Sequence, residues 1–217
     1  TTGYGEPLQR HFSFQDGEKV IGVLCNDSRH LPDSQESLPL TKSDDPDPPY
    51  AIGLTEQGRV LRVPLKSHED VSTKSGRRFM RVDDNDAVIA VYLCLGTEKV
   101  AVATKGGRAM LFPVEETPIL ARSGKGSLGI KLRDDDRVIA FELATGTLDG
   151  PTVITSFGRD LVVRERKFGM GKRGARGKVV LKRGTIDKWV RGPVTMLGVP
   201  DSDEEDDATE ETTRGDA

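Results

Sequence analysis

The stretch Val102-Ala-Thr-Lys-Gly-Gly-Arg-Ala-Met-Leu-Phe112 decides the fold, because it places a Gly-Gly pair between two short runs of apolar residues. A tight hairpin needs residues that accept a positive φ, and glycine adopts that conformation at the lowest cost. Lys105 and Arg108 flank the glycine pair on either side. The stretch therefore predicts a β-hairpin with a basic tip.

The hairpin pattern recurs at a nearly constant interval along the chain. Gly58, Gly107 and Gly158 each precede an arginine, at spacings of 49 and 51 residues. Self-similarity at a fixed period is typical of repeat architectures, and four strands per ~50 residues is the size of a propeller blade. In the second repeat we expect strands at Lys99–Lys105, Arg108–Val114, Ser127–Leu132 and Arg137–Ala144. The sequence therefore predicts an all-β, propeller-like fold of four-stranded blades that repeat every ~50 residues.

Outside the three complete repeats, the chain contains segments of a different kind. Phe12–Gly22 resembles the second half of a repeat, so we expect a partial disc of about 3.5 blades that belongs to a longer protein. Residues 26–49 are acidic and rich in proline and read as an insert, and residues 201–217 read as a disordered acidic tail. We therefore expect one folded domain over residues 1–200, interrupted by the insert.

The acidic residues are segregated, so the formal net charge of −3 conceals a basic domain. The tail carries a net charge of −8 and the insert −4, which leaves +9 on the rest of the chain. Such asymmetry favours a polyanionic partner, most often nucleic acid.

Positive charge is most concentrated between Arg164 and Arg191, a stretch with eleven Lys or Arg residues and only two acidic residues, Glu165 and Asp187. Glycines alternate with basic residues across Gly171–Gly177, so we expect both backbone amides and side chains to approach phosphates. No aromatic run accompanies the cluster, which argues against a stacking platform for single strands. The pattern favours contact with the backbone of duplex DNA, weakening steeply with salt.

The sequence offers little that could perform catalysis. Ser123-Gly-Lys-Gly-Ser127 departs from a phosphate-binding loop, because Ile119 stands where that motif needs glycine and Gly126 where it needs Ser or Thr. The histidines lie far apart and lack Cys partners, so we expect no metal site. Serines have no histidine nearby to act as a base, so we expect no catalytic residue and no cofactor in this segment.

Cys25 and Cys94 lie in apolar, strand-like runs with no further cysteine nearby. We expect both to be buried free thiols of a reducing compartment. No apolar run of about 18 residues and no signal-peptide pattern is present, so we expect a cytoplasmic protein without a membrane partner.

Three stretches of the second repeat carry a resemblance to a known family: Val102–Pro113, Gly124–Leu132 and Asp136–Ala140. They resemble one blade of the C-terminal domain of bacterial DNA gyrase A, and related blades occur in the corresponding chain of topoisomerase IV. The resemblance extends over residues 1–25 and 50–197. It implies a β-pinwheel, a disc of four-stranded blades in which neighbours exchange strands and whose basic rim binds and bends duplex DNA.

The resemblance further implies a role in an ATP-dependent type IIA DNA topoisomerase, in which this segment wraps or guides duplex DNA for strand passage. The segment itself would be non-catalytic. ATP and Mg would serve the holoenzyme, which would also contain the ATPase B subunit. Two copies of gyrase A would join through their N-terminal parts, and the enzyme would be associated with the nucleoid. Gly171–Gly177 agrees at five of seven positions with the gyrase box Q-[RK]-R-G-G-[RK]-G. Both a gyrase-like and a topoisomerase IV-like enzyme remain open.

Equivalent loops of stacked blades face the same way, so basic residues beside the tips and in the cluster should share one perimeter. The expected DNA-binding residues are Arg59, Arg62, Lys105, Arg108, Lys125, Arg159, Lys172, Arg173, Arg176, Lys178, Lys182 and Arg183. The alternative is a propeller-like protein-interaction module whose basic face binds an acidic partner protein.

Overall fold

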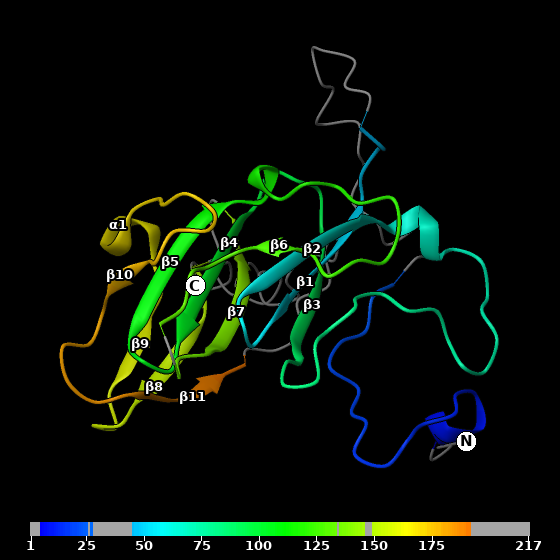
Figure 1. Ribbon diagram of the computed structural model, residues 1–217, viewed down its shortest axis with the longest axis horizontal. Helices are drawn as coiled ribbons and strands as arrows, with labels where there is room; N and C mark the ends of the chain where they lie inside the picture. The colour runs from blue at the N-terminus through cyan, green and yellow to red at the C-terminus, as the bar shows by residue number, and fades with distance from the viewer. Residues whose placement is uncertain (1–4, 26, 28–44, 134, 146–148, 192–217) are drawn as a thin grey trace, which may run out of the picture.

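The computed structural model describes residues 5–25, 27, 45–133, 135–145 and 149–191. Over these residues the chain forms eleven strands in three antiparallel sheets (Figure 1). The strands are β1 (Tyr50–Thr55), β2 (Arg59–Pro64), β3 (Val88–Cys94), β4 (Lys99–Thr104), β5 (Arg108–Pro113), β6 (Ser127–Leu128), β7 (Val138–Ala144), β8 (Thr152–Thr155), β9 (Asp160–Val162), β10 (Lys178–Val179) and β11 (Ile186–Val190). Short helices are η1 (Leu8–Arg10), η4 (Leu65–His68), η5 (Val114–Glu116) and α1 (Glu165–Phe168). The predicted all-β class is confirmed.

Each sheet is centred on the hairpin of one repeat. The first sheet has the order β3-β1-β2-β6, the second β7-β4-β5-β10, and the third β11-β8-β9. β6 follows β5 in sequence, yet it pairs with β2 of the preceding repeat, and β10 in the same way pairs with β5. Adjacent repeats therefore exchange a strand, as a pinwheel requires.

Glycine permits this exchange, because two backbones approach closely where the donated strand begins. Gly126 has a φ of +72°, and a Cβ there would lie 2.5 Å from the carbonyl oxygen of Val60. Gly177 has a φ of +66°, and its Cβ would lie 2.8 Å from the carbonyl oxygen of Ala109. Any other residue would meet both backbone strain and steric overlap at these positions.

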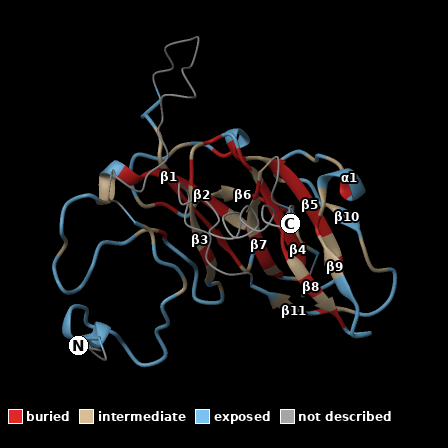
Figure 2. Cartoon of the chain, turned by 180° about the vertical axis from the view of Figure 1, so that it is seen from behind, coloured by how far each residue is buried: buried red, intermediate tan, exposed pale blue. Residues whose placement is uncertain are grey.

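The core lies between the sheets and is visible as the buried strands in Figure 2. β1 is buried along its whole length, because it is paired on both edges and covered on both faces. The fully buried Phe112 and Phe141 belong to the cluster that joins the first and second sheets. β3 packs against β7, and β7 against β11, so these strands form the inner side of the arrangement. β6, β10 and β9 lie at the opposite, outer ends of their sheets.

The N-terminal segment corrects one expectation. Within residues 5–25 the structure contains η1 and no strand, so Phe12–Gly22 does not form the expected half blade, and the described residues hold three sheets. The first sheet ends at β3, and residues 5–25 add no strand to its free edge. The segment instead loops out from the first sheet as coil (Figure 1, blue), and Leu24 near its end packs against the cluster of Leu61 and Leu65.

The two cysteines differ in their surroundings. Cys94 is fully buried in β3, as expected, and burial raises the pKa of its thiol. Cys25 is exposed, so the expectation of a buried thiol is wrong there, because its run forms no strand that could be covered. Most of the acidic insert (28–44) and the whole tail (201–217) lie outside the described residues. In the described part of the chain, no helix is both long and apolar enough to cross a membrane.

Candidate nucleic-acid interface

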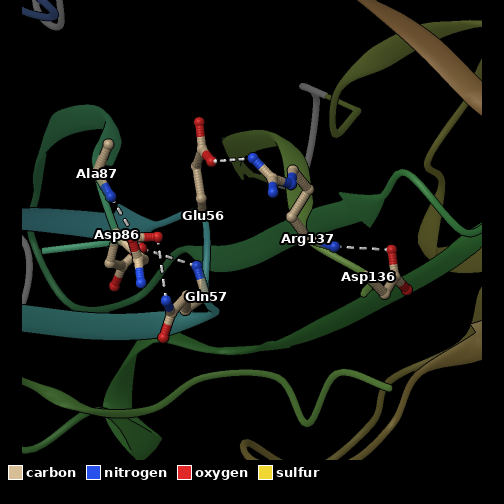
Figure 3. Close-up of polar contacts among 7 residues, drawn as sticks. Glu56, Gln57, Asp86, Ala87, Asp136 and Arg137 are labelled. Carbon is tan, nitrogen blue, oxygen red and sulfur yellow. Dashed lines mark hydrogen bonds and ion pairs between the residues drawn. The ribbon is translucent and has the colours of Figure 1, made fainter. Parts of the chain in front are cut away.

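Each of the three hairpin tips is hydrogen-bonded to a loop of its own repeat, the first two through an aspartate of that loop. In the first repeat the carboxylate of Asp86 accepts a hydrogen bond of 2.9 Å from the amide of Gln57 (Figure 3). In the second, the carboxylate of Asp136 accepts one of 2.7 Å from the amide of Gly106. The third tip uses Ser156, whose hydroxyl accepts a hydrogen bond of 3.1 Å from the amide of Thr185. The recurring aspartate of the sequence repeat thus holds the tip in place.

The tips are also linked from one repeat to the next. The amide of Val138 donates to the carbonyl of Glu56 at 2.7 Å, and the amide of Ile186 donates to that of Lys105 at 2.9 Å. The guanidinium of Arg137 adds an ion pair of 3.0 Å with the carboxylate of Glu56 (Figure 3). Because the first and second tips each contact the loop of the following repeat, the three tips succeed one another along one side of the sheets. Lys105 and Arg159 beside them are exposed, whereas Arg59 and Arg108 are half-buried.

An open depression of about 620 Å³ lies beside the second tip, and Thr185 of the third repeat also lines it. Its basic lining comes from Lys105, Arg108, Arg133 and Arg137, and its acids are Asp135 and Asp136. The carboxylate of Asp136 is already occupied by three donors, among them the hydroxyl of Thr104. Sequence reasoning missed Arg133 and Arg137, although both stand next to the recurring Asp136 motif. The depression is suited to an anion such as a phosphate group.

The densest exposed charge follows the outermost strand of the second sheet. Five exposed basic residues lie in β10 or close to it in sequence, and among the described residues their side chains form no ion pair. They are Lys172, Arg176, Lys178, Lys182 and Arg183. Together with the exposed tip residues Lys105 and Arg159 they make up what we call the basic edge.

Arg62 does not belong to this edge, which corrects the sequence interpretation. Its exposed fraction is only 7%, and its guanidinium carbon lies 4.9 Å from the centroid of the Tyr50 ring. The hydroxyl of Tyr50 donates to the carbonyl of Pro46, and burial raises the pKa of that tyrosine. β2 is covered on both faces beyond its first residue, so the side chain of Arg62 is directed into the protein.

Three further expected residues are engaged by contacts within the protein. The guanidinium of Arg173 donates to the carbonyls of Glu116 (2.5 Å) and Leu128 (2.8 Å), and so fastens the third repeat to the second. Arg108 donates to the carbonyl of Gly177 at 2.9 Å. Lys125 forms an exposed ion pair of 2.5 Å with Asp83, and this hydrogen bond and charge lower the pKa of that carboxyl. These side chains stabilise the strand exchange or are partly neutralised.

The glycine-rich stretch is also less open than its sequence indicates. The amide of Gly171 donates to Leu111, and the amide of Gly174 donates to Gly129. The amides of Arg173 and Ala175 are likewise bonded within the protein. The expectation that these four amides approach phosphates is therefore wrong. Among the described residues, no group of three or more His, Cys, Asp or Glu is placed to hold a metal ion.

Comparison with known proteins agrees with this architecture. The family model described as DNA gyrase C-terminal domain, beta-propeller, matches residues 50–94 and 98–145, the first two repeats. DNA gyrase A of Aminobacterium colombiense is 25% identical over 181 residues, which cover 83% of this chain and 20% of that protein. DNA gyrase A of Rickettsia prowazekii is 29% identical over 145 residues, 66% of this chain and 14% of that protein. The chain thus spans about a fifth or less of the length of these relatives.

Solved structures share the fold. The C-terminal domain of a DNA topoisomerase IV superposes with a TM-score of 0.69 at 21% identity, covering 86% of this chain and 54% of that one. The E. coli ParC C-terminal domain gives a TM-score of 0.61 at 19% identity, covering 87% and 71%. A DNA gyrase A C-terminal domain gives 0.54 at 21% identity, covering 77% and 61%. With its matched repeats, its gyrase A relatives and its strand-exchanged sheets, the chain is similar in sequence to the C-terminal part of DNA gyrase A and shares the fold of the C-terminal domains of DNA gyrase A and topoisomerase IV.

Proposed function

We propose that the chain binds and bends duplex DNA along its basic edge and so guides DNA for strand passage by a type IIA topoisomerase. The observation that carries the proposal is the set of seven exposed basic side chains, without ion pairs among the described residues, on or near the outer strand β10 and on the second and third tips. Such side chains neutralise phosphates and release counterions, which gives affinity without reading the base sequence.

The shape of the fold supports bending. β3, β7 and β11 pack together on the inner side, whereas the donated strands lie on the outer side, so the outer edge is convex. A duplex that follows a convex edge has to curve around it. Smooth bending of 20–30 bp through 40–90° costs about 1–6 kcal/mol, which several charge-assisted phosphate contacts can offset.

The proposal extends to the whole enzyme. The chain would act as the C-terminal part of gyrase A or of its topoisomerase IV counterpart, whose remaining part holds the cleavage tyrosine and the contact with a second copy. ATP and Mg would be bound elsewhere in the holoenzyme, with ATP hydrolysed by the B subunit. The enzyme would work on the nucleoid in the cytoplasm.

The test compares two variants with equal loss of charge. One carries Lys172→Ala, Arg176→Ala and Lys178→Ala on the basic edge. The other replaces the exposed Lys19, Lys66 and Lys74, which belong neither to a tip nor to a donated strand. Affinity for a 30-bp duplex is measured by fluorescence anisotropy between 50 and 200 mM salt.

We expect the edge variant to bind at least about tenfold more weakly at 50 mM salt. Its slope of log K against log[salt] should become shallower by up to about 2.7, at about 0.9 for each lost phosphate contact. The control variant should stay close to the unaltered chain. Equal behaviour of the two variants would refute the basic edge as the DNA-binding surface. If the unaltered chain bound no duplex and instead captured an acidic protein, the interaction-module hypothesis would replace the proposal.

A further inference from the structure

The third hairpin tip carries an exposed aromatic side chain that the other tips lack. Phe157 precedes Gly158 and has an exposed fraction of 64%. The equivalent residues are Gln57 in the first repeat and Gly106 in the second. The turn itself therefore does not require a phenylalanine, and leaving most of this apolar ring exposed to water is unfavourable.

The Phe157 ring is supported from behind. A Cβ on Gly184 would lie 2.6 Å from Cε2 of the ring and 3.1 Å from Cζ, so the ring rests directly on the backbone of that glycine. The loop below is bonded to the tip twice: the amide of Ser156 donates to the carbonyl of Thr185 at 2.8 Å, and the amide of Thr185 donates back to the hydroxyl of Ser156. One edge of the ring, at Cε2 and Cζ, thus lies against the loop while most of the side chain remains open to solvent.

Basic residues adjoin Phe157 on its own tip and on the loop that supports it. Arg159 follows it on the tip, and Lys182 and Arg183 lie on the supporting loop, all exposed. The acids nearby are Asp160 and Asp187, and the latter already accepts a hydrogen bond of 2.6 Å from the hydroxyl of Thr185. With these basic side chains on phosphates, an apolar side chain beside them would be placed to meet the stacked bases.

We propose that Phe157 is an apolar wedge, which inserts between two neighbouring base pairs of the duplex held by the basic edge and kinks it there. This inference rests on the proposed function. Proteins that bend DNA use such wedges to unstack one base step, and the resulting bend brings more of the duplex against the protein. The wedge should prefer pyrimidine–purine steps, which unstack most easily.

The experiment uses the full chain and a 30-bp duplex that carries 2-aminopurine at a central TA step and a donor–acceptor dye pair at its ends. Phe157→Gln installs the side chain of the first tip, and Phe157→Leu keeps an apolar wedge. Phe14→Gln removes a second exposed phenylalanine, which lies in the N-terminal segment away from the tips.

We expect Phe157→Gln to change the affinity less than about threefold and to leave the salt slope unchanged. It should abolish the rise in 2-aminopurine fluorescence and lower the energy transfer between the duplex ends. Phe157→Leu and Phe14→Gln should retain both signals. Unchanged fluorescence and energy transfer in Phe157→Gln, with binding intact, would overturn the wedge alone. Failure of the unaltered chain to bind the duplex would overturn the proposed function as well.

Discussion

Replacing Gly126 by alanine tests the geometry of the strand exchange, and Gly76 supplies a matched control. The two glycines have nearly the same backbone conformation, with φ of +72° and +71°. A Cβ on Gly126 would lie 2.5 Å from the carbonyl oxygen of Val60 and 3.1 Å from Cε of Met80. A Cβ on Gly76 would meet nothing within 4 Å. The pair therefore separates backbone strain from steric overlap.

The expected magnitudes follow from these distances. Left-handed backbone costs an alanine about 1–2 kcal/mol relative to glycine, and both variants lose this amount. Overlap in a packed region adds about 1–3 kcal/mol for Gly126→Ala alone. We therefore expect the free energy of unfolding to fall by about 1–2 kcal/mol for Gly76→Ala and about 2–5 kcal/mol for Gly126→Ala.

The assay is unfolding in guanidinium chloride, followed by far-UV circular dichroism and by the fluorescence of Trp189, the single tryptophan. Trp189 lies in β11 and reports on the third sheet and its contact with the core. If the donated strand is lost first, the dichroism of Gly126→Ala should change at lower denaturant than the fluorescence. Equal destabilisation by the two substitutions would refute the close approach of Gly126 to Val60 as the reason for glycine.

Two further predictions concern buried and half-buried polar contacts. Burial raises the pKa of Glu142 above 4.5, so its contribution to stability is fully present below that pH and is lost as the pH rises through the folded-state pKa. Glu142→Gln keeps an acceptor for the indole N–H of Trp189, which now lies 2.8 Å from the carboxylate. This variant should unfold at a higher denaturant concentration than the unaltered chain at pH 7, and at the same concentration near pH 4.5. A difference that does not depend on pH would contradict this reasoning. Arg173→Ala should lower the free energy of unfolding by about 1–3 kcal/mol, because it removes two hydrogen bonds between repeats. Replacing the exposed Lys172 by alanine should change the free energy of unfolding by less than about 0.5 kcal/mol. Equal losses for the two variants in the same denaturant assay would show that Arg173 does not stabilise the contact between repeats.

The strands are largely predictable because their signals are local. The sequence predicts strands at Lys99–Lys105 and Arg108–Val114, and β4 and β5 end one residue earlier in each case. It also predicts one strand over Ser127–Leu132, but this stretch pairs only over its first two residues. Beyond them the amides of Gly129 and Ile130 turn to the carbonyl of Gly58, a contact that no local pattern encodes.

The basic residues are predictable as a population and not one by one. Arg62 and Arg59 both lie in β2, yet Arg62 stacks on Tyr50 inside the protein because the packed sheet covers its side chain. Arg173 lies among exposed basic residues in the sequence, but its hydrogen-bond partner Glu116 is 57 residues away. Charge counts locate an electropositive region, whereas the role of each side chain depends on contacts made at long range.

The donated strand also determines how such a chain can lengthen or shorten in evolution. β6 completes the sheet of the repeat before it, and β10 does the same one repeat later. A duplication of one whole repeat adds one sheet that needs a donated strand and one strand to donate, wherever the duplication begins. A deletion of half a repeat leaves either a sheet without its donated strand or a donated strand without its sheet. Gene rearrangements that survive should therefore come in steps of ~50 residues, and the length of arc available to the ligand should grow in the same increments.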